Sequence, residues 1–184
     1  MLNFQGMHNV SNAVGVFAAA DIAGIPPHKI VAGLARYTPD SVRQNLVEVG
    51  GYRLLIDTYS STPPSAISAV ETLCTLPVAE GSRRIAIVSD IPDQGDQSVQ
   101  NHIEVGEAIA GLDFDLLLCV GDDSRHIVDV VRRAGKEAHF FEGREEFNRM
   151  IAEQARPGDV LLFKGGTRVK LLEKTVRPLF GKVA

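Results

Sequence analysis

The sequence predicts an α/β protein, namely a doubly wound and mostly parallel sheet with helices on both faces, preceded by two further helices. From about residue 46 onward, short apolar runs alternate regularly with longer segments of helical periodicity. The runs Ile85–Val88, Leu116–Val120 and Val160–Phe163 lack the polar alternation of a strand with one solvated face. Runs that are apolar on both faces are typical of parallel strands covered by helices on both sides.

The first part of the chain is predicted to be helical. The apolar stripe that includes Val10, Val14 and Phe17 indicates a helix over about residues 8–23, and Pro26-Pro27 opens a second helix that continues through Leu34. Before them, Leu2 and Phe4 look like the end of a strand.

The rest of the chain follows a linker at residues 38–41. Residues 46–49 and 52–57 flank Gly50-Gly51, which predicts a β-hairpin with a two-glycine turn. The alternation beyond it predicts strands at 84–89, 115–120, 137–141 and 159–164, and helices at 64–76, 98–112, 124–134, 145–155 and 168–179.

The two N-terminal helices have no sheet of their own to pack against. We therefore expect residues 1–42 to be the tail of another domain together with a hinge linker, and residues 43–184 to form the doubly wound domain. Without a partner, residues 1–40 should expose an apolar face and be either mobile or used in self-association.

Composition limits the function classes. With 184 residues and 45% hydrophobic residues, the chain can bury a real core, and its net charge of −4 argues against nucleic acid as a partner. No signal peptide and no apolar stretch of membrane-spanning length is present, so no membrane partner is expected. Cys74 and Cys119 lie in apolar surroundings and read as buried free thiols of a reducing compartment, which favours the cytoplasm.

Polar side chains gather where the predicted strands end, which is where ligands bind in doubly wound folds. They include Asp57, Tyr59, Asp90 and Lys164, the last followed by Gly165-Gly166-Thr167-Arg168. No G-x-G-x-x-G or G-x-x-x-x-G-K-[ST] pattern occurs, so the sequence does not support a dinucleotide or P-loop site made by this chain alone.

Asn9 and Asn12 lie three residues apart at the start of the first predicted helix, so their side chains are neighbours on its surface. Each carboxamide offers a donor and an acceptor, as the edge of an adenine requires. The alternative is helix capping, because Asn is a favoured cap and Gly6 could start the turn.

Four spaced elements are informative in combination. They are Gly6-x-His8-Asn9-x-x-Asn12-Ala13, Arg43, Leu55-Ile56-Asp57-Thr58-Tyr59-Ser60-Ser61-Thr62-Pro63, and Lys164-Gly165-Gly166-Thr167-Arg168. Together they resemble the Mur ligases, which are ATP-dependent amide-bond-forming enzymes of peptidoglycan precursor synthesis. The stretch Ser89–Gly106 resembles one found in the branch that adds D-alanyl-D-alanine to the UDP-muramoyl tripeptide.

The resemblance implies a chain that begins inside the central ATPase domain and continues through a Rossmann-like C-terminal domain. In the family, ATP phosphorylates a substrate carboxylate, and an amine attacks the acyl phosphate. The phosphate-binding loop, the Mg²⁺-binding glutamate and the carbamylated lysine of the family have no counterpart here. We therefore expect ATP and Mg²⁺ to be held mainly by an upstream part, no catalytic or metal-binding residue in this chain, and no ligase activity from the chain alone.

The resemblance also implies roles for single residues. Asn9 and Asn12 match the adenine-contacting pair, Arg43 the hinge arginine that reaches the nucleotide, and Asp57 the acid on the ribose side. The residues matched to the substrate side, which handles the UDP-muramoyl peptide and the incoming amino acid or dipeptide, are Tyr59, Asp90, Lys164 and Arg168.

Departures from the family pattern fall on the amine-substrate side. Ser60, Ser61 and Thr62 stand where the branch has asparagines, Ser89 replaces a glycine, and Gly166-Thr167 carries an extra residue. Two alternatives therefore stay open: a free-standing binding module or scaffold without catalysis, and a related ligase for another acceptor, as in folylpolyglutamate-type enzymes.

Local structural roles are the alternatives for single side chains. Asp57 could cap the turn that follows it, and Lys164 could be a solvated strand end. Asp122 and Asp123 are expected to cap the helix near residue 124. His8 is expected to be a structural hydrogen-bonding group at its helix start, and His102 is expected to pack under the sheet edge.

Overall fold

A computed structural model describes residues 4–38 and 40–183, and it contains one six-stranded sheet in the order β1-β2-β6-β3-β4-β5. Every neighbouring pair is parallel except β1 with β2. The strands are β1 (Asn45–Val49), β2 (Tyr52–Asp57), β3 (Arg84–Ser89), β4 (Leu116–Val120), β5 (Ala138–Phe141) and β6 (Val160–Lys164). The strands predicted from residue 46 onward are all present, within one residue at each end.

The antiparallel pair is the predicted hairpin. Val49 of β1 faces Tyr52 of β2, and the two residues between them, Gly50 and Gly51, have φ angles of 57° and 85°. Two successive positive φ angles match the right-handed twist of the flanking strands, and glycine adopts them without steric strain.

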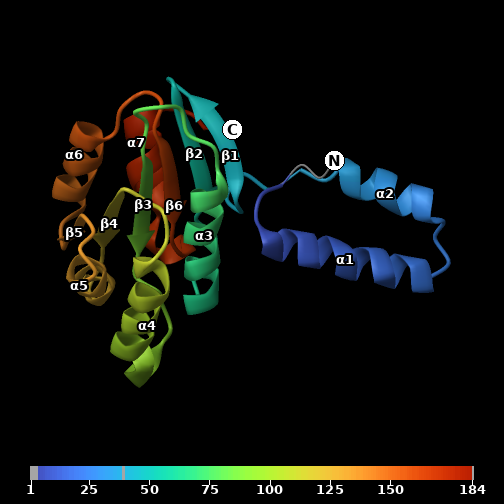
Figure 1. Cartoon of the computed structure of the whole chain (residues 1–184), viewed down its shortest axis with the longest axis horizontal. Coiled ribbons are helices and arrows are strands. Elements are labelled where there is room, and N and C mark those ends of the chain that lie inside the picture. Colours follow the sequence, from blue (N-terminus) through green and yellow to red (C-terminus); the bar gives the residue numbers. More distant parts are fainter. Residues whose placement is uncertain (1–3, 39, 184) are drawn as a thin grey trace.

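Helices cover both faces of the sheet, as Figure 1 shows. Helices α3 (Pro63–Thr75), α4 (Ser98–Ala110) and α5 (Arg125–Arg133) pack on one face, where alternate strand residues such as Leu55 and Leu162 contribute to the core. Helix α6 (Arg144–Gln154) and the C-terminal segment pack on the other face. The prediction of a doubly wound fold with two buried layers is confirmed.

The C-terminal segment is not the single helix predicted for residues 168–179. It consists of a 3₁₀ turn, η2 (Thr167–Val169), a π-helical segment, η3 (Leu172–Val176), and a short helix, α7 (Arg177–Phe180). Lys170 interrupts the helix with φ 54°. Pro178 has no N–H to donate to the carbonyl of Lys174, which instead accepts a hydrogen bond of 2.8 Å from Asn148 Nδ2.

Helices α1 (Met7–Ile22) and α2 (Pro27–Ala35) project away from the sheet and its covering helices (Figure 1). Only Ala13 on α1 and Ile30 on α2 are buried. Phe4 lies outside any strand, contrary to prediction, and Leu2 lies outside the described residues. None of the helices described for this chain is long and apolar enough to cross a membrane.

The start of α1 is attached to α3. His8 Nδ1 and Ser68 Oγ form a hydrogen bond of 2.8 Å, so the structural role expected for His8 is confirmed. Gly6, the residue before the helix, has φ 87°, and a Cβ there would lie 2.8 Å from Thr72 Oγ1. The chain therefore enters α1 close against α3, and this contact fixes where the first turn of α1 lies.

Candidate functional site: a cavity at the carboxyl edge of the sheet

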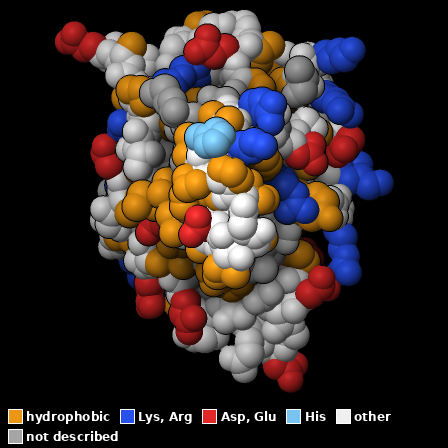
Figure 2. Space-filling model, turned by 90° about the vertical axis from the view of Figure 1, so that its right-hand side faces the viewer, with side chains coloured by type: hydrophobic (Ala, Val, Ile, Leu, Met, Phe, Trp, Pro, Cys, Tyr) orange, Lys and Arg blue, Asp and Glu red, His pale blue; other side chains and the backbone are white. Residues whose placement is uncertain are grey.

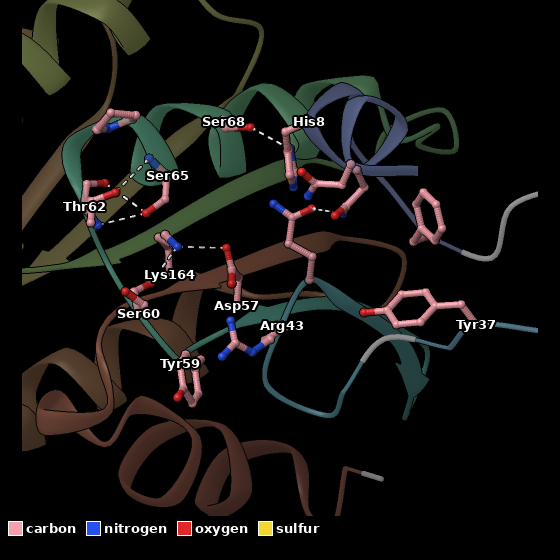
Figure 3. Close-up of a pocket in the computed structure, with 15 residues that line it drawn as sticks. His8, Tyr37, Arg43, Asp57, Tyr59, Ser60, Thr62, Ser65, Ser68 and Lys164 are labelled. Carbon is pink, nitrogen blue, oxygen red and sulfur yellow. Dashed lines mark hydrogen bonds and ion pairs between the residues drawn. The ribbon is translucent and has the colours of Figure 1, made fainter. Parts of the chain in front are cut away.

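A cavity of about 540 Å³ lies where the first turns of α1 face the carboxyl ends of β2 and β6 (Figure 3). Its walls come from four separate stretches of the chain: the start of α1, the segment around the 38–44 linker, the residues after β2, and the end of β6. The lining residues are Phe4, His8, Asn9, Asn12, Tyr37, Arg43, Gln44, Asp57, Tyr59, Ser60, Thr62, Pro64, Ser65, Ser68 and Lys164.

Asn9 and Asn12 both line this cavity. Neither caps the helix, because Gly6 is the cap residue and the described start of α1 has no side-chain cap. The Asn9 amide nitrogen donates to the Gln5 carbonyl at 2.8 Å and to Gln44 Oε1 at 3.4 Å. Its amide orientation is thereby set, and Asn9 Oδ1 is left as an acceptor, while Asn12 is exposed.

Two aromatic rings stand beside the asparagine pair. Phe4 and Tyr37 meet edge to face, with ring centroids 5.7 Å apart, and both line the cavity. Neither residue was predicted to belong to a site. Phe4 lies just before α1 and Tyr37 just after α2. These positions could have indicated that the two rings meet, because the ends of an αα-hairpin lie close together.

Asp57 and Lys164 meet at the floor of the cavity. They are register partners on the neighbouring parallel strands β2 and β6. Lys164 Nζ lies 2.9 Å from Asp57 Oδ2 and donates a second hydrogen bond of 2.8 Å to the Ser60 carbonyl. Both side chains are buried, with Lys164 1% exposed and Asp57 8% exposed. Lys164 is therefore not a solvated strand end, and Asp57 pairs across the sheet instead of capping a turn.

Arg43 enters the cavity from the linker and stacks on Tyr59. Its guanidinium carbon lies 3.5 Å from the centroid of the ring (Figure 3). The loop after β2 is tied to the linker, because the Thr58 N–H donates to the Val42 carbonyl at 2.8 Å. Arg43 itself is exposed, so its cationic group can meet a ligand at the mouth of the cavity.

The N-terminus of α3 forms another wall. Thr62 and Ser65 form a capping box, in which each side chain bonds the backbone N–H of the other. Pro63 and Pro64 stand in the first turn, where a missing N–H costs nothing. With Arg43, this helix end makes that side of the cavity favourable to negative charge.

Asp90 lies outside this cavity. Its carboxylate accepts three backbone hydrogen bonds, from the N–H groups of Asp122 (2.6 Å), Asp123 (3.1 Å) and Ser124 (2.7 Å). The capping of α5 was predicted for Asp122 and Asp123. That prediction is wrong, because no side chain caps α5 and Asp123 instead accepts from Ser98 Oγ at 2.6 Å. Asp90, from the loop after β3, holds the turn that precedes the helix.

Arg168 also lies outside the cavity, in the turn after β6. Its guanidinium pairs with Asp93 Oδ1 at 2.6 Å, and both side chains are largely exposed. The structure thus brings together Asn9, Asn12, Arg43, Asp57, Tyr59 and Lys164, and it leaves Asp90 and Arg168 at the neighbouring strand ends.

Among the remaining candidates, His102 is fully buried and structural. Its Nε2 accepts from the Ile91 N–H at 3.1 Å, and its Nδ1 lies 2.7 Å from the Ser98 carbonyl, which together require the neutral ring protonated on Nδ1. Cys74 and Cys119 are both free, with Cys119 buried and Cys74 half-buried. No group of three His, Cys, Asp or Glu side chains within residues 4–38 and 40–183 could hold a metal ion.

A second hollow, of about 480 Å³, runs between α1 and α2. It is lined mainly by apolar side chains, including Val16, Ile25 and Leu34. Elsewhere on the two helices, Val14, Ile22 and Val31 are between 57% and 88% exposed. Figure 2 looks at this projecting end of the molecule and shows hydrophobic side chains gathered at its centre, with Lys and Arg to one side. The apolar exposure expected for residues 1–40 is confirmed for the part of that range that the structure describes, residues 4–38 and 40.

Known proteins match this chain over nearly its whole length. It is 28% identical over 180 residues to the UDP-N-acetylmuramoyl-tripeptide–D-alanyl-D-alanine ligase of Escherichia coli (strain K12), a match that covers 97% of this chain and 38% of that protein. It is 29% identical over 173 residues to the UDP-N-acetylmuramate–L-alanine ligase of Streptomyces avermitilis, covering 89% of this chain and 36% of that protein. The chain thus spans less than two fifths of the length of these relatives.

Solved structures agree with the sequence matches. A crystal structure of MurF from Acinetobacter baumannii superposes with a TM-score of 0.83 at 25% identity, covering 98% of this chain and 39% of that chain. MurF from Thermotoga maritima, solved in complex with ADP, shares the fold with a TM-score of 0.76 at 21% identity, covering 95% of this chain and 38% of that chain. The family model for the Mur ligase, glutamate ligase domain, matches residues 42–167, and the chain therefore belongs to the Mur ligase family.

Proposed function

We propose that this chain is the C-terminal part of an ATP-dependent, amide-bond-forming ligase of peptidoglycan precursor synthesis, and that its cavity holds the adenine and ribose of ATP. The observation that carries the proposal is the convergence of Asn9, Asn12, Arg43 and Asp57 on one cavity of about 540 Å³. In this proposal residues 1–42 belong to the ATP-binding domain and its hinge, and residues 43–184 form the domain for the amino substrate.

The asparagine side suits adenine. Asn9 is held with Oδ1 as its unused acceptor, which can take a hydrogen bond from the exocyclic amino group of adenine. The carboxamide of Asn12 offers a donor and an acceptor beside it on the same helix face. Phe4 and Tyr37 supply apolar walls for a flat ring. Guanine would present a carbonyl oxygen to Asn9 Oδ1, so the arrangement favours adenine.

The opposite side suits the ribose and phosphates. Asp57 can accept hydrogen bonds from two neighbouring hydroxyl groups, and Arg43 stands at the cavity mouth as a cation for a phosphate. The N-terminus of α3 adds favourable electrostatics there. These residues bind and orient a nucleotide; none of them is proposed to transfer a proton or to form a covalent intermediate.

The relatives also suggest what the whole enzyme acts on. The proposed substrates are a UDP-muramoyl peptide and an amino acid or dipeptide, by analogy with the names of the E. coli and S. avermitilis ligases. Mg²⁺ is proposed to accompany ATP, with no ligand assigned to it among the described residues.

Tyr59 and Arg168 remain proposed substrate-side residues. The free thiols Cys74 and Cys119 fit the proposed cytoplasmic setting.

Nucleotide selectivity of this chain tests the proposal. Isothermal titration calorimetry should show saturable binding of ADP, with GDP bound about tenfold more weakly, because a mismatched buried hydrogen bond costs on the order of 1–3 kcal/mol. Asn12→Ala should reduce the preference for ADP, and the control Asn101→Ala, a half-buried asparagine of α4 outside the cavity, should not. Equal binding of ADP and GDP, or no binding of either, would contradict the proposal.

The projecting helix pair, α1 and α2, is the basis of a second proposal. We propose that a second copy of this chain covers the face of α1 and α2 in solution. The pair carries an apolar groove of about 480 Å³, lined by side chains that include Val16, Ile25 and Leu34, and Val16 and Ile25 are 54% and 44% exposed. Two identical faces of this kind can cover each other about a two-fold axis.

A further inference from the structure

We propose that Lys164 is a positioning residue, which holds the Asp57 carboxylate for a ribose and does not itself touch the nucleotide or the substrate. The inference rests on the proposed function, because it assigns a second residue to the ribose side of the same cavity. It replaces the substrate contact expected for Lys164 from the sequence.

The two residues are brought together by the sheet. They stand 107 positions apart in the sequence, yet β2 and β6 are neighbouring parallel strands in which Asp57 and Lys164 are direct partners. Side chains at such a pair point to the same face of the sheet. Figure 3 shows both side chains meeting at the floor of the cavity, with the Lys164 ammonium group directed at Asp57.

The ammonium group of Lys164 is engaged within the chain. Of its three N–H donors, one meets Asp57 Oδ2 at 2.9 Å and another meets the Ser60 carbonyl at 2.8 Å. The residue is 1% exposed. An ammonium group so deeply buried is stable only when it is paired and hydrogen-bonded, and both conditions are met by groups of the protein itself.

The pairing has a consequence for Asp57. Lys164 occupies Oδ2, and within the described residues no other side chain bonds the carboxylate, so Oδ1 is the oxygen left for a ligand. The bond from Lys164 to the Ser60 carbonyl also fixes the loop that follows Asp57. Without the lysine, the carboxylate would lose its cationic partner and could rotate away from the cavity. The lysine therefore sets the direction in which Asp57 meets a pair of hydroxyl groups.

A phosphate or substrate carboxylate has a more accessible partner. Arg43 is exposed at the cavity mouth, and Arg168 is 74% exposed in its side chain beyond the cavity. Lys164 keeps one further N–H donor, but its ammonium group is held between Asp57 and Ser60 and the residue is 1% exposed, so an anion at the cavity mouth meets the exposed arginine first. The geometry thus separates anion binding by the arginines from orientation of Asp57 by the lysine.

The test compares adenosine with 2′,3′-dideoxyadenosine, which lacks both ribose hydroxyls. Calorimetry on the wild-type chain should give a preference of about tenfold for adenosine, as expected for hydrogen bonds to a charged acceptor. Lys164→Met should bring this ratio close to one while leaving the affinity for dideoxyadenosine unchanged, and Lys164→Arg should restore part of it. The matched control Lys174→Met, an exposed lysine of η3, should keep the wild-type ratio.

A measurement on the wild-type chain covers the case in which Lys164→Met fails to fold. The side-chain ¹⁵N resonance of Lys164 should shift on binding adenosine, should not shift on binding dideoxyadenosine, and should shift no further with ADP. A further shift with ADP would mean that Lys164 contacts phosphate and would overturn the inference, as would an unchanged nucleoside ratio in folded Lys164→Met. Failure of the wild-type chain to bind either nucleoside would instead overturn the proposed function, and the inference with it.

Discussion

The guanidinium group of Arg43 lies over the ring of Tyr59, 3.5 Å from its centroid. Arg43 belongs to the linker, and Tyr59 to the loop after β2, so the contact joins the two sides of the cavity mouth. A planar cation stacked in this way is restricted in orientation while its N–H edge stays available to an anion. Tyr59, which is 46% exposed, is thus placed to orient Arg43.

Replacing Tyr59 should affect phosphate recognition. Tyr59→Leu should weaken ADP binding about two- to fivefold and leave adenosine binding unchanged, because an exposed cation–π contact is worth about 0.5–1 kcal/mol. Tyr59→Phe keeps the ring and should behave as wild type. Calorimetric titrations with both ligands check this. Equal weakening of ADP and adenosine by Tyr59→Leu would show that the ring contacts the nucleoside instead.

The Asp90 carboxylate should matter for stability. It satisfies three N–H groups at the start of α5, so Asp90→Ala should lower the free energy of unfolding by about 2–3 kcal/mol in urea titrations. Gly121→Ala should also destabilise, because Gly121 has φ 140° and a Cβ there would lie 2.3 Å from the Asp90 carboxyl group. The exposed Asp96→Ala is the control, expected within about 0.5 kcal/mol of wild type. If Asp90→Ala were as stable as this control, the three hydrogen bonds that Asp90 accepts would not contribute to stability.

The apolar face of α1 and α2 should govern self-association. Val16 lines the groove between α1 and α2 and is 54% exposed, so Val16→Glu should leave the stability of the monomer nearly unchanged and shift sedimentation velocity toward the monomer. Val99, an exposed valine of α4 at 44%, provides the matched control, and Val99→Glu should sediment as wild type. A wild-type chain that stays monomeric at about 100 μM, a concentration at which even weak homodimers form, would rule out a second copy on this face.

The Cys74 thiol should react slowly with alkylating agents. Burial raises the pKa of Cys74 from 9.0 to about 11, with the neighbouring Asp113 adding to the rise and Arg84 opposing it. The reactive thiolate is therefore scarce at pH 8, and the alkylation rate should keep rising up to about pH 11. Titration of iodoacetamide reactivity in the folded chain checks this. A rate that levels off near pH 9 would contradict it.

The same shift predicts the sign of a pH effect on stability. The folded chain holds the Cys74 proton more tightly than the unfolded chain does, so its contribution to the free energy of unfolding is complete below pH 9. That contribution should decline between pH 9 and about pH 11. Burial also raises the pKa of Cys119, so the decline should continue at higher pH. Urea titrations of Cys74→Ser against wild type isolate the first part.

Most of the fold could be predicted from local patterns. The apolar runs of β3, β4 and β6 identify buried parallel strands, and Gly50-Gly51 identifies the hairpin, because these signals lie within a few neighbouring residues. The C-terminal helix could not be predicted by periodicity alone. Its apolar spacing is helical, but Lys170 adopts a left-handed conformation and Pro178 removes a donor, so the segment divides into three short pieces.

The site could be predicted only in part. Asn9, Asn12, Arg43 and Asp57 were identified from the resemblance, and the structure brings them to one cavity. The partners of Asp57 and Asp90 could not be found, because both depend on which strands are neighbours. Pairing of β2 with β6 puts Lys164 beside Asp57, and pairing of β3 with β4 puts Asp90 below the N-terminus of α5. Nothing local in the sequence indicates either contact.

Chemical-shift mapping of ADP on the ¹⁵N-labelled chain is the most direct test of the central claim. The largest chemical-shift changes should fall on the walls of the 540 Å³ cavity. They are expected at the Asn9 and Asn12 side-chain amides and in the backbone around Arg43 and Asp57. Resonances of the loop between β4 and α5 should stay in place, because Asp90 already accepts hydrogen bonds from three N–H groups of that loop. Changes centred on that loop, with the asparagine amides unmoved, would contradict the account.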